Sequence, residues 1–139
     1  VQGEDLAIGT NRVTLHGTEK DGFGLPIPCL HLDNHDNEIA MKNYAYRKSN
    51  ELYDAVGTKR VFEAPPLPVS HNLGTCRMSA HPEDGVVNEW GQCHNVANLF
   101  VSDGSQFASS SAGGPTLPIV ALAIRQADRI AELMSAGEL

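Results

Sequence analysis

Few cysteines and aromatics, no excess of basic charge and no long apolar run characterise this sequence of 139 residues. Its 3 cysteines are odd in number and widely spaced, which argues against a disulfide framework and favours reduced, buried thiols. The formal net charge of −7 and the scattered basic residues exclude an electrostatic surface for nucleic acid. No apolar stretch reaches the roughly 18 residues that cross a bilayer, and no signal peptide is visible. We therefore expect a soluble protein, cytoplasmic or periplasmic.

The first part of the sequence predicts strands followed by one long helix. Residues 11–16 alternate polar and apolar side chains, and residues 27–32 form a second candidate strand after a glycine-containing turn. From Asn37 the apolar spacing becomes that of a helix of about five turns. Asp36 or Asn37 can cap its start, and Gly57 can end it in the left-handed conformation. A β-hairpin, or a pair of sheet strands, followed by a helix is therefore expected.

The rest of the sequence predicts loops, one short strand and a closing helix. The proline-rich residues 64–68 form an extended connector, because proline can neither continue a helix nor join a central strand. Residues 79–97 are typical of loop, and residues 98–102 of a short strand buried on both faces. Pro115 suits the first turn of the last helix. The predicted core face of that helix recurs every three or four positions: Val120, Ala123, Ala127, Ile130 and Met134.

Two short runs contain the residues best suited to chemistry. Residues 71–78 read HNLGTCRM, and residues 98–105 read NLFVSDGS. Histidine can accept a proton near neutral pH, which suits it to act as a general base. Gly74 permits a tight turn that holds the His71 imidazole at a fixed angle. By residue type alone, a single histidine such as His71 is more often structural than catalytic.

Polar contacts for a ligand are predicted at Asp103 and at the start of the last helix. The Asp103 carboxylate can accept hydrogen bonds from the hydroxyls of a dinucleotide, while Gly104 lets a ligand approach the backbone. A simple turn or cap is an equally good interpretation of Asp103. Residues 113–116 read GGPT and leave backbone N–H groups at the positive end of the helix dipole, which suits negative charge. An ordinary glycine-rich helix start is the alternative interpretation.

In this order, the two runs and the GGPT segment resemble the C-terminal part of the glucose-methanol-choline (GMC) flavin oxidoreductases. The resemblance implies that His71 faces the flavin, as the catalytic base or as a hydrogen-bond partner of the substrate oxygen. It implies that Asp103, with Gly104, contacts the ribityl-phosphate part of FAD. It further implies that the helix start at Pro115 and Thr116 stabilises negative charge near N1 and O2 of the reduced flavin.

Gly114 departs from the family pattern. The residue before the Pro-Thr pair is usually asparagine or histidine, which completes a catalytic pair with the equivalent of His71. A glycine supplies only its backbone N–H, so the second hydrogen bond comes from elsewhere, or activity is weakened, or a substitution was made. The family's Gly-x-Gly-x-x-Gly turn for FAD is also absent, because residues 22–27 read GFGLPI and lack the third glycine and the helix.

The resemblance implies an α+β fold made of parts of two domains. Residues 1–95 are expected in the substrate domain, an antiparallel sheet with helices, and residues 96–139 as one strand and the closing helix of the FAD domain. The implied partners are a missing N-terminal FAD domain and a small alcohol substrate. Without that domain, apolar surface is exposed, and a homo-oligomer is a further expectation.

The predicted function is the catalytic end of an FAD-dependent dehydrogenase or oxidase that acts on a sugar, polyol or sugar acid. The sequence looks nearest to gluconate and polyol dehydrogenases, and it does not fix whether oxygen, a quinone or a cytochrome reoxidises the flavin. The alternative is a non-catalytic interaction or scaffold module that keeps the fold. A zinc site of His71, Cys76, Cys93 and His94 is not expected, because the short cysteine spacing of structural zinc sites is missing.

Overall fold

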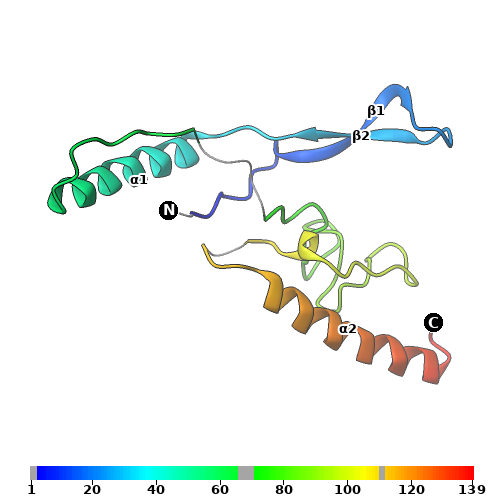
Figure 1. The fold of residues 1–139 in the computed structure, drawn as a ribbon. Helices are drawn as coiled ribbons and strands as arrows, with labels where there is room; N and C mark the ends of the chain where they lie inside the picture. The colour runs from blue at the N-terminus through cyan, green and yellow to red at the C-terminus, as the bar shows by residue number, and fades with distance from the viewer. Residues whose placement is uncertain (1–2, 66–70, 110–111) are drawn as a thin grey trace. The chain divides into compact units, whose positions relative to one another are not determined.

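The computed structural model describes residues 3–65, 71–109 and 112–139, which form a small α+β structure (Figure 1). Contacts within the chain divide it into a first unit, Val1–Val69, and a second unit, Ser70–Leu139. This division does not test the predicted boundary at residues 95 and 96, which refers to domains of a longer protein. The elements are, in chain order, β1 (Arg12–Lys20), β2 (Pro26–His31), α1 (Asp36–Ala55), the short 3₁₀ helix η1 (Gly104–Gln106) and α2 (Thr116–Ala136).

Strands β1 and β2 form the predicted antiparallel hairpin (Figure 1). Val13 lies opposite Leu30 and Leu15 opposite Pro28, so these four apolar residues share one face of the ribbon. The register shifts between Leu15 and Lys20, and β1 thereby continues beyond residue 16, where the predicted strand ends. Leu15 and Leu30 are 68% and 77% exposed. The apolar face of the hairpin is therefore uncovered within the described residues.

Helix α1 begins at Asp36, which is one residue earlier than a cap at Asp36 would place it. Asp36 and Asn37 were the predicted caps, but the N-cap position is His35, whose backbone N–H donates to Glu38 Oε2 at 3.1 Å. The other carboxylate oxygen of Glu38 accepts the Leu6 backbone N–H at 3.0 Å. These bonds, chiefly that from Leu6, lower the pKa of Glu38, and they tie the start of the chain to the first turn of the helix.

Helix α1 ends as predicted, and the chain then returns along it (Figure 1). Gly57 has φ +74° and donates its N–H to the Asp54 carbonyl. The returning segment is held by the Tyr46 hydroxyl, which donates to the Ala64 carbonyl at 2.6 Å, and by a bond between the Asn50 and Glu63 side chains. Residues 66–68 of the predicted connector lie outside the described residues.

The second unit has a small core built from loops. Val87 is fully buried, and Cys93 beside it is 9% exposed. Single β-bridges join Val87 to Met78 and to Cys93, so the predicted loop over residues 79–97 is confirmed as a loop with isolated pairings. All three cysteines are free, as predicted, although only Cys93 is buried.

The predicted strand over residues 98–102 does not form. Phe100 makes one antiparallel bridge with Gln92, and Leu99 is exposed. A strand needs a neighbour along its length to satisfy its backbone groups. Within the described residues this run forms a β-bridge at one position only, which is why it remains a loop.

Helix α2 has two apolar faces, and the predicted core face was wrong in part. Val120 and Met134 belong to the predicted face but are exposed. The face that packs consists of Ile119, Leu122, Gln126, Ile130 and Leu133, of which Gln126 and Leu133 are buried. The opposite face is exposed and contains Leu117, Val120, Ile124 and Met134, which we call the apolar stripe. Neither α1 nor α2 combines the length and apolarity of a membrane-spanning helix.

Candidate functional site

The two runs that carry the predicted site residues are joined by their backbones. The Cys76 N–H donates to the Ser105 carbonyl at 2.9 Å, and the Met78 N–H donates to the Gln106 carbonyl at 2.7 Å. Alternate residues of the first run thus bond to successive residues of η1. The structure therefore brings the histidine-bearing run and the aspartate-bearing run side by side within the second unit.

Gly104 is the point at which three segments meet. A Cβ atom at this position would lie 2.7 Å from Leu73 Cδ2, 3.2 Å from Ile119 Cδ1 and 3.6 Å from the Asn72 carbonyl oxygen. Leu73 and Asn72 follow His71 directly, and Ile119 lies in the first turn of α2. A side chain at this position would displace the Leu73 and Ile119 methyl groups, so packing within the chain also favours glycine here. The predicted role of Gly104 toward FAD stays a prediction.

Asp103 lies in the second run and caps η1. Its Oδ1 atom accepts the Ser105 backbone N–H at 2.8 Å and the Ser105 hydroxyl at 2.5 Å. These two bonds, the hydroxyl first, lower the pKa of Asp103, so the carboxylate is ionised at neutral pH. The side chain is exposed, and a carboxylate has about four acceptor positions on its two oxygens. The cap therefore leaves Asp103 able to accept further hydrogen bonds.

His71 is exposed at the beginning of the second unit's described residues. The next two residues place their carbonyl and side chain against Gly104, so the backbone that carries the imidazole is anchored to η1. Gly74 has φ +84°, which confirms the predicted turn after His71. This turn and the bonds from Cys76 fix the path of the run from which His71 projects.

The start of α2 is shifted by one residue from its predicted position. Pro115 is buried at the N-cap position with no side-chain cap, and the helix proper begins at the exposed Thr116. Pro118 has no N–H, so Thr116 and Leu117 carry the N–H groups that point out of this first turn. Gly114 is exposed and, among the described residues, no heavy atom lies within 4 Å of a Cβ added there. A side chain at position 114 would have room.

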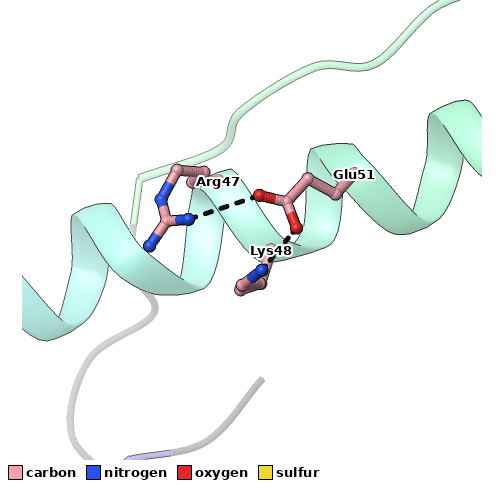
Figure 2. A network of polar contacts seen from close by, with 3 residues as sticks. All are labelled: Arg47, Lys48 and Glu51. Carbon is pink, nitrogen blue, oxygen red and sulfur yellow. Dashed lines mark hydrogen bonds and ion pairs between the residues drawn. The ribbon is translucent and has the colours of Figure 1, made fainter.

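A hollow of about 440 Å³ lies in the first unit and includes none of the predicted site residues. It borders the polar face of α1, where Glu51 pairs with Arg47 at 3.3 Å and with Lys48 at 2.5 Å (Figure 2). The bond from Lys48 chiefly lowers the pKa of Glu51. All three side chains are about half exposed, so the pairs add little to stability. We assign no chemistry to this hollow.

The remaining titratable groups contribute little to the site. In the part of the chain that the structure describes, no cluster of three or more His, Cys, Asp or Glu side chains could hold a metal ion. The His94 Nε2 atom lies 3.1 Å from the Ser79 hydroxyl, and the His31 Nε2 atom lies 2.8 Å from the Thr14 hydroxyl. These histidines support loop and strand structure.

Sequence reasoning missed the buried glutamines. Gln106 in η1 is 2% exposed and Gln126 in α2 is 5% exposed. Gln126 follows Ile119 and Leu122 and precedes Leu133 at helical spacing. Its position on the apolar face was the available signal, since a polar residue in such a row requires a buried hydrogen-bond partner.

Comparison with known proteins gives a family match over most of the chain. Residues 8–123 match the family model described as GMC oxidoreductase. The chain is 42% identical over 136 residues to the 2-methyl-1,2-propanediol dehydrogenase of Mycolicibacterium austroafricanum, covering 96% of this chain and 25% of that protein. It is 31% identical to the fructose dehydrogenase large subunit of Gluconobacter japonicus, covering 96% of this chain and 25% of that subunit.

A third relative is named for a different substrate from the first two. The chain is 26% identical over 140 residues to the gluconate 2-dehydrogenase flavoprotein of Pantoea cypripedii, covering 94% of this chain and 23% of that protein. The chain thus spans about a quarter of the length of each of these relatives. The matched residues 8–123 include all the predicted site residues, from His71 to Thr116.

Proposed function

Because the chain belongs to the GMC oxidoreductase family as its C-terminal region, we propose that it is the catalytic end of an FAD-dependent enzyme that oxidises an alcohol group. The family consists of flavoprotein dehydrogenases and oxidases. The relatives are named for a diol, a ketose sugar and a sugar acid, which supports a sugar, polyol or sugar acid as the substrate class. The single observation that carries the proposal is the meeting of the His71 run, η1 and the first turn of α2 at Gly104.

The residues present fit contacts to FAD at two places. Asp103 offers an ionised, exposed carboxylate for hydroxyl groups of the cofactor, and Gly104 lets Leu73 and Ile119 pack closely against that turn. Pro115 and Thr116 form a helix start without a side-chain cap, whose N–H groups suit negative charge. When bound, FAD would accept the hydride that leaves the substrate carbon. The chain contributes the groups that orient the cofactor and remove the proton.

His71 is proposed as the base. Its imidazole is exposed, so substrate has access, and the turn at Gly74 fixes the backbone that carries it. A neutral imidazole nitrogen accepts the hydroxyl proton as hydride departs, which is the usual role of histidine as a general base. The proton then passes from His71 to solvent when the product leaves.

Gly114 is the position at which this chain differs from the family's usual catalytic pair, in which asparagine or histidine partners the equivalent of His71. With no side chain, position 114 cannot donate to the substrate oxygen except through its backbone N–H. The open space at that position means that packing within the described residues does not require glycine. The site we propose therefore relies on His71 and on backbone donors.

A missing N-terminal domain is the proposed partner of the apolar stripe on α2. Leu117 is 81% exposed, and Ile124 and Met134 also face outward. The relatives contain about three times as much additional chain as this one covers, which provides a segment to bury the stripe. Association of two copies through the same stripe is the other expected outcome.

The test is kinetic and uses the longer protein that carries this region, purified with its flavin. His71→Ala should lower the rate of flavin reduction by alcohol by about 10²- to 10⁴-fold, the usual contribution of a general base. His81→Ala is the matched control, because His81 is an exposed histidine in a turn of the same unit and should leave the rate unchanged. If the rate of flavin reduction in His71→Ala fell by less than about tenfold, His71 would not be the base.

The alternative, a non-catalytic interaction or scaffold module, is favoured by the glycine at position 114. Gly114→Asn distinguishes the two functions, because the described residues leave room for the new side chain and the fold should be preserved. A large gain in turnover from a very low starting rate would indicate a degenerate site and support the module. An unchanged rate would mean that another group already supplies the second hydrogen bond.

A further inference from the structure

Gln126 joins two loop segments to α2 by a single buried amide. Its Nε2 atom donates to the Trp90 carbonyl at 3.0 Å and to the Val101 carbonyl at 2.8 Å. Both amide hydrogens are therefore used, and the side chain is 5% exposed. The Val101 N–H in turn donates to the Gly91 carbonyl at 2.8 Å. These bonds join the turn at Trp90 and Gly91, the second run at Val101, and α2 at Gln126. We call them the polar tie.

The polar tie joins α2 to the run that carries Asp103, at a point well along the helix from its start. Val101 precedes Asp103 by two residues, and Gln126 lies ten residues after Thr116, or about 15 Å along the helix axis. A helix is stiff over this length. The bond from Gln126 to Val101 is therefore a second link, besides the packing of Ile119 at Gly104, that sets how the aspartate-bearing turn lies relative to the start of α2.

We propose that Gln126 is a positioning residue for FAD, which holds Asp103 at the correct place relative to the first turn of α2. This inference rests on the proposed function. An amide suits the role because one nitrogen supplies donors for two carbonyls at once. Methionine would fill the same volume but would leave both carbonyls without a donor, and glutamate would place a negative charge against them.

Arg125 provides a matched control on the same helix. It donates to the Glu89 carbonyl at 3.0 Å, and its guanidinium lies 4.0 Å from the centre of the Trp90 ring. It thus contacts the same turn as Gln126 but does not bond to Val101. A variant at Arg125 loosens the turn and leaves the link toward Asp103 intact.

The experiment measures the FAD dissociation constant of the longer protein by titration of its apoenzyme. Gln126→Met should raise this constant by about tenfold, whereas Arg125→Met should change it by less than about threefold. In an Asp103→Asn background the effect of Gln126→Met should fall below about threefold, because the two residues act through one contact. A full tenfold effect in that background would assign Gln126 a structural role only.

A second measurement uses the wild-type protein, in case Gln126→Met does not fold. If the polar tie favours FAD binding, then FAD binding must strengthen the polar tie by the same free energy. The Val101 amide should therefore exchange its hydrogen about tenfold more slowly with FAD bound than without it. Unchanged exchange would overturn this inference and leave the proposed function standing, whereas a wild-type protein that binds no FAD would overturn both.

Discussion

Gly91 occupies a position where any side chain would collide with the polar tie. Its φ is +71°, and a Cβ atom would lie 2.2 Å from Gln126 Nε2 and 2.7 Å from the Val101 carbonyl oxygen. The left-handed conformation costs an alanine about 1 to 2 kcal/mol. Crowding in a filled site adds about 1 to 3 kcal/mol. Displacement of the amide from its two carbonyls adds about 1 to 3 kcal/mol more.

We therefore expect Gly91→Ala to destabilise this region locally by about 3 to 8 kcal/mol. Gly137→Ala is the matched control, because Gly137 also has φ +71° but no heavy atom of the described residues lies within 4 Å of its Cβ position. It should cost only the backbone contribution, about 1 to 2 kcal/mol. The difference between the two variants isolates the crowding against Gln126 and Val101.

Native-state hydrogen exchange in the longer protein measures this difference. The Val101 N–H, which donates to Gly91, reports opening of the polar tie, and the Glu138 N–H, which donates to Leu133, reports opening at Gly137. Gly91→Ala should accelerate exchange at Val101 by at least about 100-fold, and Gly137→Ala should accelerate exchange at Glu138 by about tenfold. Equal acceleration in the two variants would refute the close packing at Gly91.

Two further predictions concern the Asp103 cap and the apolar stripe. Because its bonds lower the pKa of Asp103, they stabilise the fold above the unfolded value of about 3.9 and lose this effect as pH falls through the lower folded value. Ser105→Ala should accordingly lower the melting temperature at pH near 6 and by less below about pH 3, and an equal loss at both pH values would contradict the assignment. Ile124→Lys in the longer protein should destabilise it by about 1.5 to 3 kcal/mol through loss of a buried isoleucine, measured by denaturant unfolding. Glu132→Lys, at an exposed polar position of the same helix, is the control, and equal effects of the two substitutions would leave the stripe uncovered.

Local sequence signals predicted the elements that are stabilised locally. The hairpin, the end of α1 at Gly57 and the presence of α2 follow from alternation, helical spacing and glycine conformation, and the structure agrees. The cap of α1 at His35 was missed because it depends on Glu38, whose carboxylate also binds the distant Leu6 N–H. No local rule gives weight to histidine as a cap, so a tertiary contact decided the boundary.

The packed face of α2 was harder to predict because apolar residues surround the helix. A row through Val120 and Met134 and a row through Ile119 and Leu133 both have helical spacing, and periodicity alone does not rank them. Gln126 lies in the second row, which the sequence-based prediction did not consider. The hydrogen bonds that make this residue suitable for burial come from Trp90 and Val101, which are far away in the sequence.

In the candidate site, too, the chemically active side chains were predictable from the sequence, whereas the packing that arranges them was not. His71 and Asp103 are exposed and were identified by residue type within a family pattern. Their arrangement depends on backbone bonds from Cys76 and Met78 and on the absence of a side chain at Gly104. Because such contacts carry no functional group, substitutions at these supporting positions should impair cofactor contact while leaving every chemically active side chain in place. The geometry of the site is thus encoded mainly by residues that take no part in its chemistry.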